Sequence, residues 1–204
     1  MSAVYDYLQL TLSPSPAPHP ALAKRLAATA PKLSAAGGEI IGQWAPQLGW
    51  PNDQAAVLVR WSGARGDLDM ITNAEGVANA RFEQLAPTVR PGDASLPARG
   101  GIYVHRWFAV EAGAEDEFVR LSSEGWEHFE AQFDAKIFGL LRADVTDADR
   151  RAAVTRLLLV TRYGDHGVWE ASRDPTSEAM QVFMRRQQLT RRSWAASTRL
   201  IASS

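Results

Sequence analysis

The sequence contains two similar halves, and each half begins with an aromatic-rich, apolar segment. The segment YDYLQLTL at 5–12 is matched by YVHRWFAV at 103–110, which starts 98 residues later. Two further pairs follow in the same order: EIIG at 39–42 with KIFG at 136–139, and LVRWSG at 58–63 with LVTRYG at 159–164. A repeat of this length indicates two copies of a small domain rather than a solenoid of short units.

Each half also shows the same expected order of strands and helices. In the first half we expect strands at 4–12, 39–44, 55–61 and 81–88, with helices at 21–36 and 67–78. In the second half we expect strands at 101–110, 135–141, 156–163 and 194–201, with helices at 114–133 and 177–188. The resulting β-α-β-β-α-β order is that of the ferredoxin-like fold, with both helices on one face of an antiparallel sheet. Pro31 predicts a kink or an early end of the first helix.

A segment with several prolines and glycines separates the two copies. We expect ferredoxin-like repeats at 1–90 and 101–204, with 91–100 as the linker between them. The second copy is longer in two places, a charged loop or short extra helix at 142–153 and the segment 165–192. Insertions on a rigid scaffold often carry function, so these two segments are of interest.

Two strands of the second copy, 137–141 and 157–160, are almost continuously apolar. An antiparallel sheet with one face in water would show alternation instead, so both faces of these strands should be covered. Helices can cover one face, and the sheet of the sister repeat is the simplest cover for the other. The expected fold class is therefore α+β, with two tandem ferredoxin-like repeats forming a dimeric-α/β-barrel-like fold.

The composition argues against several classes of partner and cofactor. Lysine and arginine total 22 against 23 acidic residues, so no strong field should attract nucleic acid or an acidic membrane. Cysteine is absent and no long apolar run occurs, which favours a cytoplasmic protein. The four histidines lack metal-ligand spacing, and phosphate-binding and serine-nucleophile motifs are missing. We therefore expect no metal site and no cofactor.

The second copy resembles NIPSNAP-type domains. Its opening segment, 103–113, is similar to the family's first strand, which reads Tyr-Glu-Leu-Arg-x-Tyr-x-Leu-x-x-Gly. The residues Arg185, Arg186, Leu189, Thr190 and Ser197 are similar to the family's last helix and strand. The resemblance implies the dimeric α/β barrel group, which includes cofactor-independent monooxygenases, haem-degrading proteins, chlorite-dismutase-like haem enzymes and members without known activity. Single-copy relatives dimerise to close a barrel, whereas this chain could use its own two halves; a homodimer is compatible with either.

The departures from the family pattern suggest candidate residues. Val104 stands at the family's glutamate position while Arg106 keeps its arginine, and the matching positions of the first copy are Asp6 and Leu8. One hypothesis is that Asp6 and Arg106 face a shared cavity, and the alternative is that each has only local partners.

Strand alternation places Arg106 and Phe108 on one face and His105 and Trp107 on the other. We expect the first pair inside the barrel and the second pair beneath the helices. Arginine beside aromatic rings at the ends of the third strands can bind a carboxylate or a planar ligand, although an arginine there can also simply cover apolar surface. The ligand-binding candidates are Asp6, Arg106, Phe108, Arg162, Trp61 and Tyr163.

These features favour a protein that binds or transforms a small planar or aromatic molecule in the barrel cavity, as a cofactor-independent oxygenase or isomerase does. No residue pattern identifies a catalytic group. The alternatives are a non-catalytic binding or interaction protein and, as the resemblance implies, a haem-binding barrel in which His166 is an axial ligand rather than a solvated turn residue.

Overall fold

The computed structural model describes residues 3–92, 97 and 100–201, and it divides into two compact units. The first unit ends at Ala86 and also includes the chain from Thr198 onward; the second runs from Pro87 to Ser197. The segment from Thr198 was expected with the second repeat, but its Ile201 N–H donates to the Gln43 carbonyl of the first unit (2.7 Å). Part of the expected linker, 93–96 and 98–99, lies outside the described residues.

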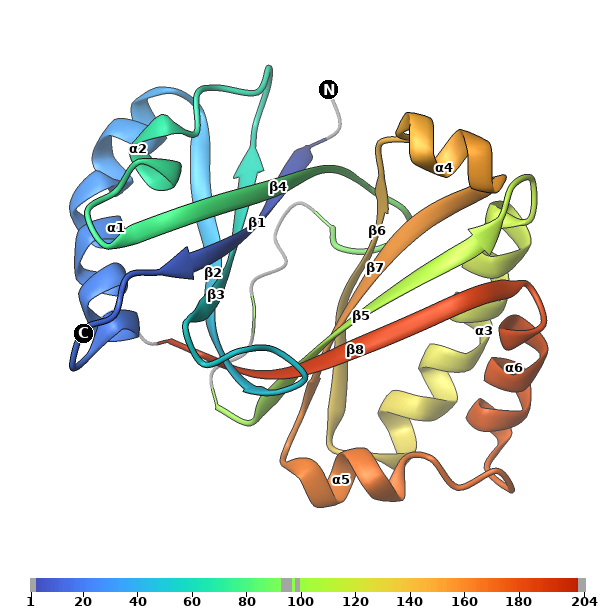
Figure 1. The fold of residues 1–204 in the computed structure, drawn as a ribbon. Helices are drawn as coiled ribbons and strands as arrows, with labels where there is room; N and C mark the ends of the chain where they lie inside the picture. The colour runs from blue at the N-terminus through green and yellow to red at the C-terminus, as the bar shows by residue number, and fades with distance from the viewer. Residues whose placement is uncertain (1–2, 93–96, 98–99, 202–204) are drawn as a thin grey trace. The chain divides into compact units, whose positions relative to one another are not determined.

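The first unit is an antiparallel sheet with helices on one face (Figure 1). Its strands are β1 (Val4–Leu12), β2 (Gly38–Leu48), β3 (Gln54–Trp61) and β4 (Val77–Pro87), in the order β4-β1-β3-β2. Its helices are α1 (Pro18–Ala35) and α2 (Asp69–Thr72). The core between sheet and helices contains Leu8, Leu10, Leu22, Leu26, Leu33, Val57, Val59 and Trp61.

Both helices of the first unit differ from expectation. Helix α1 continues through Pro31 to Ala35, and Leu33 beyond the proline is fully buried, so burial offsets the lost backbone hydrogen bond and the helix does not end early. Helix α2 has only four residues, whereas we expected one at 67–78. The chain turns at Gly76, which has a positive φ of 86°, and enters β4 at once.

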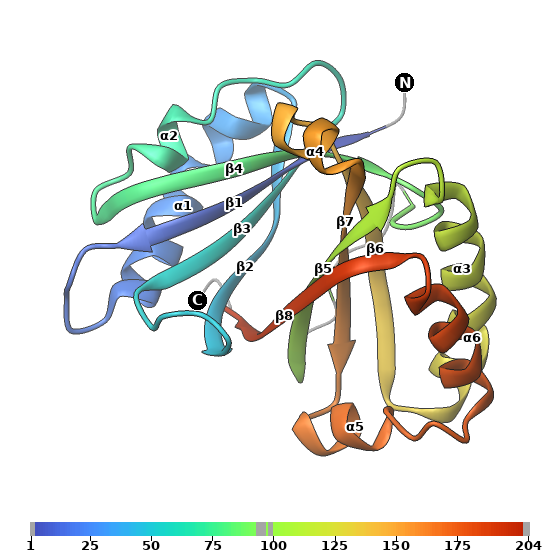
Figure 2. The ribbon, with the colours of Figure 1, turned by 45° about the vertical axis from the view of Figure 1, so that its right-hand side comes forward.

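The second unit repeats the same plan with longer helices. Its strands are β5 (Ile102–Glu111), β6 (Ala135–Ala143), β7 (Val154–Tyr163) and β8 (Thr190–Leu200), in the order β6-β7-β5-β8. Its helices are α3 (Glu115–Gln132), α4 (Asp147–Ala152), α5 (His166–Ala171) and α6 (Glu178–Gln187). Figures 1 and 2 both show α3 and α6 side by side on one face of this sheet. The expected α+β class with two ferredoxin-like repeats is therefore confirmed.

Local sequence explains where the helices of the second unit begin. Three acidic residues occupy the first turn of α3, where the helix dipole favours negative charge. The Ser177 side chain caps α6, and Thr146 with Asp149 forms a capping box on α4. Among the described residues, no helix is both long and apolar enough to cross a membrane.

The two units share a strand irregularity as well as a topology. The β2–β3 ladder shifts register between Ile40 and Gly42, and the β6–β7 ladder shifts between Ile137 and Gly139. Before the shift, Gly38 pairs with Trp61 in one unit and Ala135 pairs with Tyr163 in the other. Trp61 and Tyr163 are therefore structurally equivalent. The matched segments LVRWSG and LVTRYG had instead aligned Trp61 with Arg162, so the observed equivalence is shifted by one residue.

Candidate functional site

A cavity of about 210 Å³ lies inside the second unit, between its sheet and its helices. Strands β5, β6 and β7 form its floor, and α3, α5, α6 and the residues just after α5 form its walls. The lining is dominated by aromatic and aliphatic side chains, with arginine as the charged component. The residues that the argument below uses are Arg106, Phe108, Phe129, Thr161, Tyr163, Trp169, Met180, Phe183 and Arg186.

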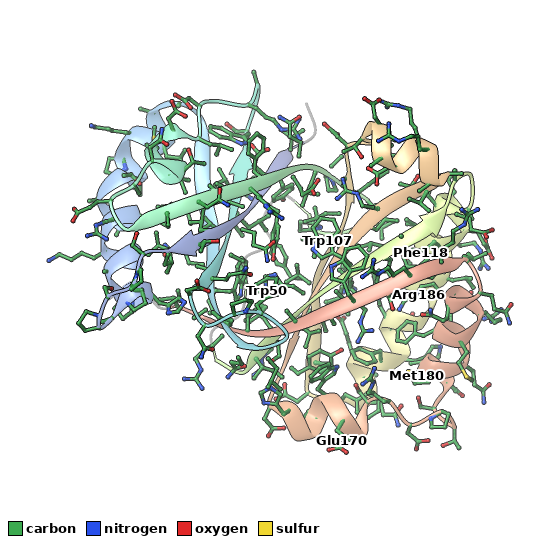
Figure 3. All side chains as sticks on the ribbon, viewed as in Figure 1. Trp50, Trp107, Phe118, Glu170, Met180 and Arg186 are labelled. Carbon is green, nitrogen blue, oxygen red and sulfur yellow. The ribbon has the colours of Figure 1, made fainter. Side chains whose placement is uncertain are left out.

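Strand β5 presents Arg106 and Phe108 to this cavity. Phe108 makes an edge contact with Phe118 of α3, with ring centroids 4.9 Å apart. On the opposite face, Trp107 stacks on Trp194 of β8 at 6.2 Å. Figure 3 shows Trp107 on one side of the sheet and Phe118, Met180 and Arg186 on the other.

The expectation that Arg106 and Phe108 face away from the helices, with His105 and Trp107 beneath them, is therefore wrong. The strand carries large side chains on both faces, so alternation alone defines two faces without saying which one the helices cover. Burial of His105 was expected beneath the helices, but it occurs on the opposite face, where the side chain is 1% exposed. Burial lowers the pKa of His105 to about 3, so it is neutral at physiological pH.

Arg186 of α6 is the least usual residue of the cavity, because its guanidinium is buried and only 7% of the residue is exposed. The guanidinium carbon lies 4.5 Å from the ring centroid of Phe183, 4.9 Å from that of Phe108 and 5.1 Å from that of Phe118. One terminal nitrogen, Nη1, donates to the Ser122 hydroxyl (3.2 Å). Aromatic faces and one hydroxyl therefore surround the charge.

No described carboxylate compensates this charge. Arg185, the next residue, pairs with Glu124 at 2.5 Å, whereas neither Arg186 nor Arg106 forms an ion pair with any described residue. The buried Nε of Arg186 has no hydrogen-bond acceptor there. Burial first, and the nearby positive charge of Arg106 second, lower the pKa of Arg186 to about 9. It remains protonated at neutral pH, and an unpaired buried charge of this kind is costly.

Two more polar groups complete the charged end of the cavity. Burial lowers the pKa of Arg106, partly opposed by Tyr163, while Arg173 lowers it further. Burial raises the pKa of Tyr163, and the charge of Arg106 and a hydrogen bond with Ser172 oppose that shift. Tyr163 therefore stays protonated and can donate or accept a hydrogen bond.

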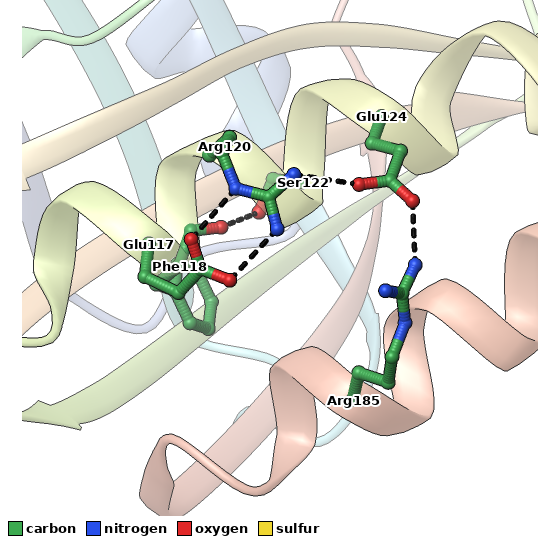
Figure 4. A network of polar contacts seen from close by, with 6 residues as sticks. All are labelled: Glu117, Phe118, Arg120, Ser122, Glu124 and Arg185. Atoms are coloured by element: carbon green, nitrogen blue, oxygen red, sulfur yellow. Dashed lines mark hydrogen bonds and ion pairs between the residues drawn. The ribbon is translucent and has the colours of Figure 1, made fainter.

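The packing interface between α3 and α6, called the seam below, supports the cavity wall. Gly125 of α3 lets α6 approach closely, since a Cβ at this position would lie 2.3 Å from Cε1 of Phe183. On the outer surface, Glu117, Arg120, Glu124 and Arg185 form a chain of ion pairs across the two helices (Figure 4). Gly125 thus sets how closely α6, which carries Phe183 and Arg186, approaches α3.

The first-unit candidates form a separate, local cluster. Asp6 is 1% exposed, accepts a hydrogen bond from Trp61 Nε1 (2.6 Å) and lies 3.3 Å from Arg65 Nε. Trp61 is fully buried and packs in the first-unit core. Asp6 therefore has the local partners of the alternative hypothesis, and a cavity shared with Arg106 stays a prediction.

Arg162 lies outside the cavity. Its guanidinium pairs with Asp134, and its Nε donates to the Gly100 carbonyl (3.4 Å). The equivalent residue of the first unit, Arg60, pairs with Glu39 in the same manner (2.5 Å). Of the six ligand-binding candidates, Arg106, Phe108 and Tyr163 meet in one cavity, whereas Asp6, Trp61 and Arg162 do not lie in it.

Several lining residues had no individual signal in the sequence. Trp169 of α5, and Met180 and Phe183 of α6, all come from the long segment 165–192. The extra length of that segment was the available signal, because an insertion in one copy has to build something that the other copy lacks. Arg186 was visible only as part of the NIPSNAP-like pattern.

The cavity residues do not fit haem. The cavity has less volume than the roughly 300–1,000 Å³ of sites for drug-sized ligands, and no histidine lines it. His105 lies on the far side of the strand, and Nε2 of His166, in the first turn of α5, is 2.9 Å from Ser197 Oγ. Within the described part of the chain, no group of three or more potential metal-binding side chains occurs.

Comparison with known proteins identifies the fold. No family model matches the sequence, and no curated protein matches it. An anthrone oxidase-like protein is 14% identical, with a TM-score of 0.61 over 99% of this chain and 92% of the other. A ferredoxin fold protein from Listeria monocytogenes, related to antibiotic biosynthesis monooxygenases, is 9% identical, with a TM-score of 0.50 over 99% of this chain and 96% of its own.

A NIPSNAP domain protein from Burkholderia xenovorans is 16% identical and has a TM-score of 0.37. It covers 47% of this chain and 90% of its own length. The expected resemblance to NIPSNAP-type and dimeric α/β barrel proteins is thus confirmed, with the NIPSNAP likeness confined to about half of the chain. These similarities identify the fold alone: the chain consists of two tandem ferredoxin-like units.

Proposed function

We propose that the second repeat binds a small aromatic or otherwise planar molecule in the cavity between its sheet and helices α3, α5 and α6. The observation that carries the proposal is the cavity of about 210 Å³ with a buried, unpaired Arg186 among aromatic rings. Binding sites of this kind are mostly apolar and contain a few polar groups that orient the ligand. The volume suits a compound of one or two rings.

Binding without chemistry is the first form of this proposal, because no described aspartate, glutamate or histidine lines the cavity. Those side chains are the usual general bases, and a proton-transfer reaction needs one within hydrogen-bond reach. The lining therefore offers recognition more readily than proton abstraction.

Transformation by a cofactor-independent oxygenase or isomerase is the second form. Two arginines and the Tyr163 hydroxyl could stabilise negative charge that develops on a ligand oxygen, which is often a large contribution to catalysis. The likeness to an anthrone oxidase-like protein motivates this test but shows only a shared fold. Oxygen uptake in the presence of bound ligand would support the oxygenase form. Recovery of unchanged ligand after prolonged incubation with oxygen would support binding without chemistry.

A cavity-filling variant tests the proposal itself. Met180→Trp introduces a larger side chain from a part-buried position in the cavity wall, and Met70→Trp makes the same change in the first unit, away from the cavity. Titration calorimetry with 2-naphthoate and with 2-naphthamide should show at least a tenfold loss of affinity for the first variant only. Equal affinities in both variants, or no binding of either compound to the wild type, would reject the proposal.

A further inference from the structure

We infer that the ligand of the second-repeat cavity is an aromatic carboxylic acid, and that Arg186 is the residue that selects its carboxylate. This inference rests on the proposed function and specifies the class of ligand. Three observations support it: arginines at the cavity without a carboxylate partner among the described residues, a buried Nε–H of Arg186 that likewise lacks an acceptor there, and an aromatic lining.

The first step is the charge of the cavity. Arg106 and Arg186 both line it, and neither forms an ion pair with a described residue. By contrast, the nearby arginines Arg162 and Arg185 each have a carboxylate partner. A third lining arginine, Arg173, is exposed and lies over the ring of Trp169. Two buried or half-buried guanidinium groups without an anion are costly to keep, so the missing partner is best supplied by a ligand.

The second step is the donor geometry of Arg186. Nη1 is occupied by the Ser122 hydroxyl, and that hydroxyl in turn donates to the Phe118 carbonyl (2.7 Å). The guanidinium is thereby anchored through one nitrogen, while the buried Nε has no acceptor among the described residues. A planar guanidinium held in this way presents its remaining N–H groups to a planar anion such as a carboxylate.

The third step is the remainder of the lining, which limits the ligand to a compact acid. Phe108, Phe129, Trp169 and Phe183 offer aromatic faces and edges, and Thr161 and Tyr163 supply the neutral polar groups. Such walls stack a flat ring and leave one end of it beside the arginines. The small volume and the single charged end match one carboxylate on one or two rings.

The stability of the empty protein provides a readout that a purely structural arginine would not give. A buried charge without a carboxylate partner carries an uncompensated desolvation cost, and an apolar side chain of similar length removes that cost. Arg186→Met should therefore raise the melting temperature of the ligand-free protein, and it should abolish the additional stabilisation that an acid gives. A purely structural arginine would lower the melting temperature when it is replaced.

The experiment compares acids with their neutral amides on the full chain. The ligands are benzoate with benzamide and 2-naphthoate with 2-naphthamide, and the proteins are wild type, Arg186→Met, Arg106→Met and the control Arg185→Met. Arg185 is adjacent on α6 but 55% exposed and paired with Glu124, so its loss changes the same net charge outside the cavity. Calorimetry gives the affinities, and thermal melts give the stability of each variant.

We expect wild type and Arg185→Met to bind an acid at least tenfold more tightly than the matching amide, a difference of about 1.4 kcal/mol. Arg186→Met should lose this preference while still binding the amide, and Arg106→Met should retain part of it. Equal affinities for acid and amide in the wild type would overturn the inference but leave the proposed function standing. An acid preference that survives Arg186→Met would also overturn it, and absence of binding by all four compounds would reject both proposals.

Discussion

The two repeats have the same strand ladder but fill the space between sheet and helices differently. Where the first repeat has Leu8, which is fully buried, the second has Arg106 at the cavity. The first repeat has Trp61, which packs in the core and donates a hydrogen bond to Asp6, where the second repeat has Tyr163 at the cavity wall. The helix-facing core of the first repeat is filled by apolar side chains, whereas the same layer of the second repeat contains the cavity.

The helices explain how this difference is built. The second helix of the first repeat is a single turn, α2, whereas α5 and α6 together occupy the matching part of the second repeat. Residues of the longer segment line the cavity, and in the first repeat Trp61 is fully buried in the core. The longer segment of the second repeat thus supplies part of the cavity lining.

The largest effect should come from breaking the solid core of the first repeat. Trp61→Ala removes a fully buried ring and the donor that satisfies Asp6, so we expect a loss of about 3–5 kcal/mol in the free energy of unfolding. Trp169→Ala, at the part-buried wall of the cavity, should cost less than half as much. Urea unfolding followed by circular dichroism measures both, and equal losses would contradict the solid-core description.

The second effect is a pH dependence that originates in the second repeat. The pKa of His105 is lowered to about 3 in the folded protein, from about 6.5 when unfolded. Between these values the unfolded state binds more protons, so stability falls as the pH drops through this window. From pH 7 to pH 5 the loss from this group should be about 2 kcal/mol.

Replacing His105 by glutamine should flatten this part of the pH profile. Unfolding free energies measured at half-unit intervals between pH 4.5 and 7.5 provide the comparison. A profile of His105→Gln that parallels the wild type would show that another group causes the acid sensitivity.

The third effect concerns the seam that supports the cavity. Gly125→Ala places a methyl group against the Phe183 ring, and overpacking of this kind costs about 1–3 kcal/mol, more than the helix propensity of alanine returns. Ser123→Ala, on the same helix, should be neutral or slightly stabilising because its buried hydroxyl has no partner among the described residues. Ligand affinity should fall in Gly125→Ala and not in Ser123→Ala, as measured by calorimetry alongside thermal melts. Unchanged stability and affinity in Gly125→Ala would show that α6 moves outward without cost.

The smallest effect compares two equivalent surface arginines. Arg60→Ala and Arg162→Ala each remove one largely solvent-screened ion pair, and each should cost less than about 1 kcal/mol. Neither change should alter the affinity for 2-naphthoate. A loss of affinity in Arg162→Ala alone would restore this residue as a ligand contact, which the sequence suggested.

The duplicated segments were sufficient to predict the repeat, the order of the strands and the fold class. Alternation along β5 correctly separated Arg106 and Phe108 from His105 and Trp107, because strand geometry requires it. It could not assign the faces, since large side chains occupy both. The length of α2 was overestimated because the turn at Gly76 ends the helical pattern earlier than side-chain spacing suggests.

The cavity itself was less accessible from sequence. Whether Trp61 or Tyr163 fills a space depends on how far the opposing helix stands from the sheet, and that distance is a tertiary property. Arg162 and Tyr163 were both candidates because they lie together at the end of a strand, but strand alternation places only Tyr163 at the cavity. Sequence therefore located the longer copy but not the direction in which its side chains point.

The uncompensated guanidinium of Arg186 has a consequence for how this protein can diverge. Under the proposed function, a descendant that no longer binds the ligand would remove the desolvation cost by exchanging this arginine for an aliphatic residue, so the exchange would be favoured once selection for binding relaxes. Persistence of arginine here in diverged relatives would accordingly mark lineages that still use the cavity, and its replacement would date the loss. One costly side chain can therefore serve as a record of function across a family whose sequences have otherwise drifted apart.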